Sequence, residues 1–546
     1  MTTIDTHATS AAPSGAGLAS VADWVTTTDH KKIGRLYIGA SALAGIGSIV
    51  VAALLAFERT DATGTALPVE SLTQLFSLYR FGLTYVVMLP LLVGLALCVV
   101  PLQVGARSVA FPRLAATGFW AWLTGAVVAI VSIASNGGPN GGNTRFVDLF
   151  MLATAVAVLG ILATVVSLAT SILTTRAPGM NMRRVPWFTW SVLVMSLALL
   201  VALPILVGDL LVLFLAHKYP STSELSGNRA ISDWAAFGFT QPTTLLFLIP
   251  AFGVFAETVA TATRRRLTPR GTIFAAIALV GTALYGAAVQ APVVIRAGFS
   301  SLSFGSKISD LLPYALVHVL PLLGAFLALA LTAQGLKAKP GLNAALGFGL
   351  FAALLAVLGA AGSALNHIAD AGLVGTTFEE GTWLAVVYAG VIAGMGGVVH
   401  WGPKLWGRSL PTKAVLPLGL LAFAGAALAS LPMMIAGFAD QPGGVFPAVE
   451  AGVPGVVQFE YSGPSELWNF LSLAGHALVL VSVLAFLALA IRSFAKGDTA
   501  GDDPWDGQTL EWATTSPAPE HNFAQLHIVQ SPEPLLDLKP SNRSDA

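Results

Sequence analysis

Histidine is the residue type whose spacing in this sequence says most about possible chemistry. A neutral imidazole binds transition metals and relays protons. The nine histidines are His7, His30, His217, His318, His367, His400, His476, His521 and His527. The intervals 31–216 and 218–317 contain none. The single cysteine, Cys98, excludes an intrachain disulfide and a thiolate cluster within the chain.

Histidines in the second half of the chain admit two interpretations. His318, His400 and His476 could form a proton relay, or each could pack separately, since their predicted depths differ. His367 and Asp370 could bind a divalent ion, but two ligands without a third are weak evidence for a metal site.

Four charged residues lie in or beside apolar stretches. Asp209 interrupts the run ILVGDLLVLF, where an ionisable side chain is costly in lipid and is a candidate for function. Arg80 opens another apolar stretch on the same side, so a buried Arg80–Asp209 ion pair is one hypothesis. The alternative is that both side chains extend to the membrane interface. Glu379 and Glu380 precede a further stretch and are expected to cap a helix N-terminus.

Composition places these residues in a membrane protein. Of the 546 residues, 55% are hydrophobic and only 10% are charged, whereas soluble domains average about 25% charged residues. Twenty-eight basic residues balance 28 acidic ones, and no concentrated basic face supports nucleic-acid binding. Lipid is therefore the expected surrounding.

Apolar stretches of roughly twenty residues predict an all-α bundle of twelve transmembrane helices. The predicted spans are 33–57, 80–102, 115–135, 147–172, 187–216, 234–262, 272–295, 311–333, 343–364, 382–401, 414–437 and 466–491. Residues 1–20 are small and polar and predict a disordered tail. The membrane domain is expected over 21–496, and 497–546 is expected to be an extended tail, ordered only when bound to something.

Lysine and arginine divide unequally between the two sides of such a bundle. The side that carries both termini holds 21 of the 28 basic residues, and the opposite loops hold seven. Because cytoplasmic loops are enriched in basic residues, both termini are predicted to be cytoplasmic, in a multi-pass protein of the cell's inner (plasma) membrane.

Five stretches resemble the catalytic subunit I of heme–copper terminal oxidases, the cytochrome c oxidase type, in that family's order. They are WVTTTDHKKIGRLY at 24–37, VPLQVGARSVAFPRL at 100–114, TTRAPGMNMRRVPWFTWSVL at 174–193, IPAFGVFAE at 249–257 and DDPWDGQTLEWATTSPAPEHNF at 502–523. The resemblance implies the family's twelve-helix fold, which holds two hemes and a copper ion, reduces dioxygen and pumps protons.

The resemblance also implies six histidine ligands, on the second, sixth, seventh and tenth helices, and this sequence departs from that pattern. The histidine-free intervals empty the second, sixth and seventh helices however the sequences are aligned. An alignment places the ligand positions near Tyr79, Gln241, Pro292, Val293, Gly381 and Trp383. The family's heme-propionate arginines fall near Asp440 and Gln441, and an acid cannot pair with a propionate.

The leading interpretation is a paralogue that keeps the fold without heme, copper or catalysis. It would be a structural or accessory subunit among other oxidase-type subunits of a respiratory-type complex. The first alternative is an active terminal oxidase subunit, as family similarity alone implies. The second is an ion or solute pathway in the vacated heme cavity, for which Asp209 and Arg80 are the pointers.

Overall fold

The computed structural model describes residues 16–60, 66–219, 235, 238–289, 291–341, 343–444, 464–523, 525 and 528–538. Within these residues, twelve helical segments are long and apolar enough to cross a membrane, which confirms the predicted number of spans. The α-helices are α1 (Ala16–Val25), α2 (His30–Glu58), α3 (Val69–Phe81), α4 (Leu89–Gln103), α5 (Pro112–Ala134), α6 (Thr144–Thr174), α7 (Trp187–Lys218), α9 (Thr243–Thr263), α10 (Arg270–Val280), α11 (Leu284–Val289), α12 (Phe304–Tyr314), α13 (Leu320–Ala333), α14 (Ala344–Asn366), α15 (Thr377–Trp406), α16 (Thr412–Phe438), α17 (Ser465–Lys496) and α18 (Pro534–Leu538). Two short strands, β1 (Gly137–Gly138) and β2 (Gly141–Gly142), form an antiparallel hairpin between α5 and α6.

Some spans are built from more than one helical segment. A π-helical turn, Gly82–Met88, joins α3 to α4 in the second span, and another, Ala315–Val319, joins α12 to α13 in the eighth. The sixth span runs from Thr243, directly after Pro242, to Thr263, and its predicted start at residue 234 lies outside the described residues. Proline at a helix start is favoured because it lacks the amide hydrogen that the first turn leaves unpaired.

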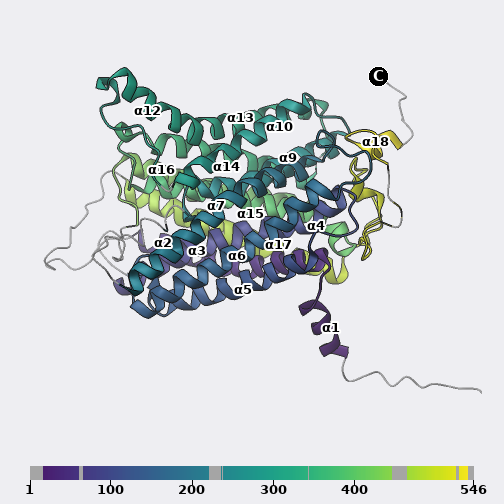
Figure 1. The fold of residues 1–546 in the computed structure, drawn as a ribbon, viewed down its shortest axis with the longest axis horizontal. Coiled ribbons are helices and arrows are strands. Elements are labelled where there is room, and N and C mark those ends of the chain that lie inside the picture. The colour runs from purple at the N-terminus through teal and green to yellow at the C-terminus, as the bar shows by residue number, and fades with distance from the viewer. Residues whose placement is uncertain are drawn as a thin grey trace, which may run out of the picture.

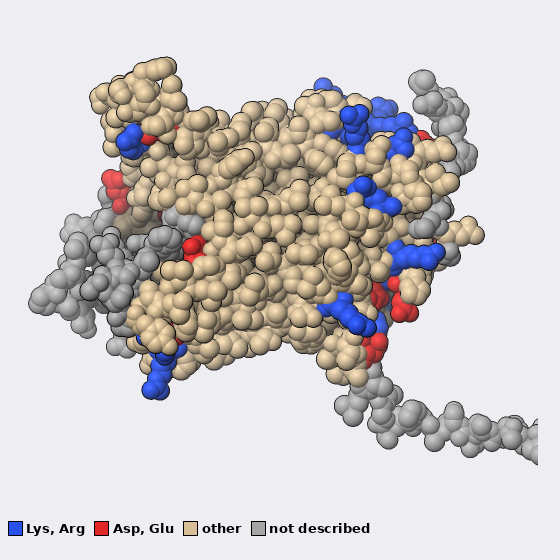
Figure 2. Space-filling model, viewed as in Figure 1, with Lys and Arg blue, Asp and Glu red and all other residues tan. Residues whose placement is uncertain are grey.

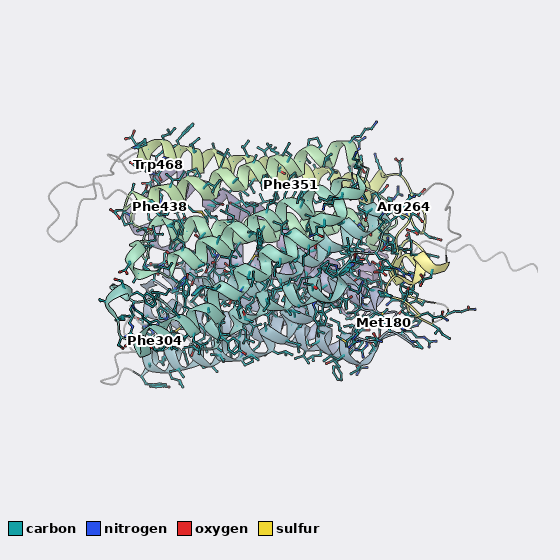
Figure 3. All side chains as sticks on the ribbon, turned by 90° about the horizontal axis from the view of Figure 1, so that it is seen from above. Met180, Arg264, Phe304, Phe351, Phe438 and Trp468 are labelled. Atoms are coloured by element: carbon teal, nitrogen blue, oxygen red, sulfur yellow. The ribbon has the colours of Figure 1, made fainter. Side chains whose placement is uncertain are left out.

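The helices run side by side along one direction and give the molecule two ends (Figure 1). We call the end that carries α1 and α18 the terminal end, and the opposite end the far end. Figure 3 marks both, with Met180 and Arg264 at the terminal end and Phe304, Phe438 and Trp468 at the far end. The second, sixth and tenth spans are almost wholly buried by the others, so they form the centre of the bundle.

Small residues allow neighbouring helices to pack closely. A Cβ atom on Gly34 of α2 would lie 2.5 Å from the carbonyl oxygen of Gly94 in α4. A Cβ atom on Gly118 of α5 would lie 2.7 Å from the carbonyl oxygen of Gly160 in α6. Only glycine fits at such crossings, where close backbone contact supplies packing energy that hydrophobic burial cannot supply in lipid.

Charged side chains concentrate at the two ends of the molecule. Figure 2 shows lysine and arginine gathered mainly at the terminal end, with fewer at the far end, and an almost uncharged surface between them. This distribution fits a bundle whose middle lies in the hydrocarbon core of a bilayer.

The described part of the C-terminal segment, predicted as an extended tail, packs across the terminal end of the bundle. Lys404 of α15 donates from Nζ to the carbonyl oxygens of Asp502, Thr514 and Thr515, at 2.7, 2.5 and 3.4 Å. Three backbone carbonyl oxygens of this proline-rich stretch are thus bonded by a side chain of the bundle. The predicted N-terminal tail falls largely on residues 1–15, outside the described residues.

Asn522 attaches the same segment to the start of α2. His30 Nδ1 lies 2.7 Å from the carbonyl oxygen of Leu97, which can only accept, so Nδ1 carries the hydrogen. His30 Nε2 is then the acceptor for Asn522 Nδ2 at 3.0 Å, while Asn522 Oδ1 accepts from Lys31 Nζ at 3.0 Å. This histidine therefore has a structural role between helix and tail.

Candidate functional site

Two of the predicted ligand positions meet at the centre of the bundle. Tyr79 of α3 and Trp383 of α15 are both buried, and their rings contact edge to face with centroids 4.9 Å apart. The Arg80 guanidinium lies over two aromatic rings of this region, 4.6 Å from the Trp383 ring centroid and 5.2 Å from the Phe76 ring centroid. Aromatic and cation–π packing therefore fills the space between these two positions.

A buried ion pair lies beside these rings. Arg59 donates from Nη1 and Nη2 to the two carboxylate oxygens of Glu380, at 2.9 and 2.8 Å, and Tyr79 donates its hydroxyl to Oε1 at 3.1 Å. Both charged side chains are less than 6% exposed. Glu380 lies in the first turn of α15 as expected, but its side chain turns inward to a bidentate partner that follows α2 and does not cap the helix.

Gly381 has no room for any side chain. A Cβ atom at this position would lie 2.5 Å from the carbonyl oxygen of Ser430 in α16. Gln441, one of the two positions aligned with the family's heme-propionate arginines, has a structural role. It is buried and donates from Nε2 to Asn469 Oδ1 at 3.1 Å. Asp440 is exposed and has a left-handed backbone, with φ of 60°.

The remaining predicted ligand positions line a cavity of about 510 Å³ in the far-end half of the bundle. Gln241, Pro292, Val293 and Trp383 all contribute to its wall. These four aligned positions therefore lie around one cavity, although none of the four residues is a histidine. Pro292 and Val293 carry no atom that could bind a metal ion through a side chain.

Two histidines that the sequence analysis treated separately stack at this cavity. The His318 and His367 rings have centroids 4.1 Å apart and planes inclined by 26°. His318 Nε2 bonds the carbonyl oxygen of Val293 at 3.0 Å, and His367 Nδ1 bonds that of Ser363 at 2.7 Å. Sequence reasoning missed this pair because the residues are 49 positions apart on different helices.

Other predicted partners are not brought together. His400 packs among aromatic rings at the terminal end, and His476 accepts or donates a 2.6 Å bond with the Tyr388 hydroxyl, so neither shares a contact with His318. Asp370 accepts from the Gly298 amide at 2.8 Å and does not join His367 at a metal site. Groups of three or more metal-binding side chains are not found within the described ranges.

Arg80 and Asp209 do not form the hypothesised ion pair. Arg80 lies against Trp383, whereas Asp209 is a partly exposed residue of α7. The reason is the arrangement of the helices, since α3 packs on α2 and α5 while α7 packs on α6 and α9.

Another group of buried polar side chains lies where the C-terminal segment meets the bundle. Glu511 Oε1 accepts from Gln103 Nε2 at 3.0 Å and from Trp401 Nε1 at 3.2 Å, while Oε2 is buried without a partner. Burial raises the pKa of the Glu511 carboxyl above its usual value, and the hydrogen bonds from Gln103 and Trp401 only partly oppose this.

Glu511→Gln is expected to reduce the decrease in folding stability that occurs as pH rises. A carboxyl whose pKa is raised on folding stabilises the fold below its unfolded pKa and loses this contribution as pH rises through the folded pKa. The amide keeps the acceptor for Gln103 and Trp401 without a charge. Thermal unfolding of both proteins between pH 5 and pH 9 checks this: the wild type should show the steeper decline, and parallel curves would contradict it.

Comparison with known proteins agrees with this fold. Residues 32–478 match the family model described as cytochrome c and quinol oxidase polypeptide I. A putative cytochrome c oxidase subunit 1-beta of Streptomyces avermitilis is 30% identical, covering 96% of this chain and 94% of its own. Cytochrome c oxidase subunit 1 of Bacillus subtilis is 28% identical over 94% and 82%, and quinol oxidase subunit 1 of the same organism is 26% identical over 95% and 80%.

The family match spans more than half of the chain and includes the helices that surround both the Tyr79–Trp383 contact and the cavity. The twelve apolar helices, and bacterial relatives that match nearly the full length of the chain, both indicate a location in the plasma membrane. The chain is a multi-pass protein of the plasma membrane and belongs to the cytochrome c and quinol oxidase polypeptide I family.

Proposed function

We propose that this chain is a cofactor-free member of its family and acts as a structural or accessory subunit of a respiratory-type membrane complex. The observation that carries the proposal is the set of side chains at the six ligand positions. Proline, valine and glycine offer no side-chain ligand, and tyrosine, glutamine and tryptophan replace the imidazoles that heme iron and copper require.

The geometry around Tyr79 supports the same proposal. The Tyr79 and Trp383 rings contact each other directly, with centroids 4.9 Å apart, so the chain's own side chains fill the space between these two positions. Gly381 lies against the backbone of α16, and the Arg59–Glu380 pair occupies the adjoining interior. The residues present do not fit a heme here, so we assign no redox step to them.

The basic terminal end supports a role in assembly. We infer that this end faces the cytoplasm, from the 21:7 division of lysine and arginine. The described part of the C-terminal segment packs on the helix ends there, and other oxidase-type subunits are the proposed partners. An active terminal oxidase subunit, which oxidises cytochrome c, reduces dioxygen and pumps protons, is the alternative that family similarity implies.

Purified protein is expected to contain neither heme nor copper in stoichiometric amount. The measurement is a visible spectrum with a pyridine extract for heme, together with elemental analysis for copper. Cytochrome c oxidase subunit 1 of Bacillus subtilis, produced in the same host, is the control for cofactor supply. A Soret band at one heme per chain or more would sink the proposal, as would loss of copper and oxidase activity on mutation of His318 or His367.

Co-purification tests the accessory role separately. Affinity capture of the tagged chain from its native membrane is expected to recover subunit II-like or subunit III-like proteins. Capture of the chain alone, in a preparation that keeps other membrane complexes intact, would argue against an accessory subunit.

A further inference from the structure

The cavity near the far end is lined by hydrogen-bond acceptors that the fold leaves without partners. Asn366, 4% exposed, has a buried Oδ1 with no hydrogen bond in the structure. Gln241 donates from Nε2 to the carbonyl oxygen of Thr382 at 3.3 Å, which fixes the amide so that its unpartnered Oε1 points elsewhere. Both residues line the cavity. A buried carbonyl oxygen without a donor costs free energy, so a bound group is expected to satisfy it.

His367 adds a third acceptor. Its Nδ1 hydrogen is used by the carbonyl oxygen of Ser363. Burial lowers the pKa of His367, against the opposing effects of that hydrogen bond and of the Glu379 charge. The imidazole is therefore neutral at pH 7, and Nε2 presents a lone pair.

Glu379 supplies a negative charge to the same wall. It is partly buried at the first turn of α15, and within the described part of the chain its carboxylate has no hydrogen-bonding or ion-pairing partner. The cavity also meets the C-terminal end of α14, which finishes at Asn366 and carries the negative end of the helix dipole. Arg80 stacks on Trp383 but does not line the cavity.

Apolar residues form most of the rest of the wall, which also includes Thr240, His318, Ser363 and Thr382. Pro242, Val293, Val294, Val317 and Val374 surround the polar group of α14 and α15 residues. A volume of about 510 Å³ lies within the range of small-molecule sites, which combine an apolar body with a few placed polar groups. The complementary molecule has a short apolar portion and a positively charged hydrogen-bond donor at one end.

We propose that this cavity binds a small organic ammonium compound. The ammonium group donates to the Glu379 carboxylate and to the acceptors on Asn366 and His367, and its apolar body contacts the valines and prolines. This inference goes beyond a structural role in a complex, because it gives the chain a ligand of its own. The site is the cavity lined by residues that align with the family's ligand positions.

Three probes of the same size separate the head groups: 2-phenylethylammonium, neutral 2-phenylethanol and phenylacetate. Binding is measured by calorimetry on the full chain in lipid nanodiscs, with empty nanodiscs subtracted for partitioning into lipid. The ammonium compound is expected to bind, the alcohol at least about tenfold more weakly, and the carboxylate not at all. Equal binding of the alcohol, preference for the carboxylate, or no binding of the ammonium compound would each overturn the proposal.

Glu379→Gln is expected to weaken binding of 2-phenylethylammonium about tenfold, or about 1.4 kcal/mol. Glu466→Gln is the matched control, since Glu466 also lies in the first turn of a helix but is exposed and outside the cavity. Val294→Trp fills the cavity and should abolish binding in a protein whose unfolding temperature is retained. Unchanged affinity in Glu379→Gln, or in a folded Val294→Trp, would contradict the site.

Discussion

Glu380→Ala is expected to be among the most destabilising single substitutions in this protein. It leaves the Arg59 guanidinium, 3% exposed, without the carboxylate that bonds two of its nitrogens. Removing the carboxylate of a buried ion pair costs about 3–5 kcal/mol, because the remaining charge stays desolvated and loses its bidentate partner. The free energy of unfolding, measured by denaturant titration in mixed micelles, should fall by this amount.

A double variant separates the effect of the two charges from the effect of the side-chain volume. Arg59→Met with Glu380→Leu removes both charges and keeps most of the volume, so it should recover most of the lost stability. Asp310→Asn is the control, because the Arg296 side chain of this ion pair is 55% exposed to solvent, so loss of the pair should have little effect. A double variant as unstable as Glu380→Ala would contradict this account.

Lys404→Met is expected to release the C-terminal segment from the terminal end. The ammonium group bonds three carbonyl oxygens of that segment and lies 5.3 Å from the Trp512 ring centroid. Hydrogen bonds to a charged group contribute about 1.5–3 kcal/mol each, so the segment should lose several kcal/mol of local stability.

Amide hydrogen exchange over residues 502–523 measures this effect directly. Protection should fall in Lys404→Met and remain unchanged in Lys413→Met, which alters an exposed lysine at the same end. Capture of partner subunits by the two variants then tests whether an attached tail is needed for assembly. Equal protection in the two variants would show that other contacts hold the segment.

The number and order of the spans could be predicted because lipid imposes a length and an apolar composition on each helix. The intervals 31–216 and 218–317 could also be read without a structure, and they leave no histidine to align with the family's second, sixth and seventh helices. Tyr79 and Trp383 were singled out only through the family resemblance, as positions on the second and tenth helices. Their contact follows from the packing of α3 on the centre of the bundle.

Pairings between distant residues could not be predicted from local pattern. Arg59 and Glu380 are 321 positions apart, and each alone fits an ordinary helix end in the sequence. Arg80 and Asp209 suggested a pair because both lie near the same predicted surface, but helix neighbours decide which charges meet. The polar composition of the tail predicts a segment that is extended until it binds something, but it does not identify Lys404, which bonds three of its carbonyl oxygens.

The contact between Tyr79 and Trp383 has a consequence for biosynthesis. An oxidase subunit whose centre is designed around macrocycles can complete its interior only after cofactor insertion. Here the chain itself supplies the rings that meet at the centre and the ion pair beside them. Under the proposed function, the newly made protein reaches its final packing as soon as its helices assemble. Its abundance in the membrane should therefore be insensitive to iron and copper starvation, in which an oxidase that needs both metals declines.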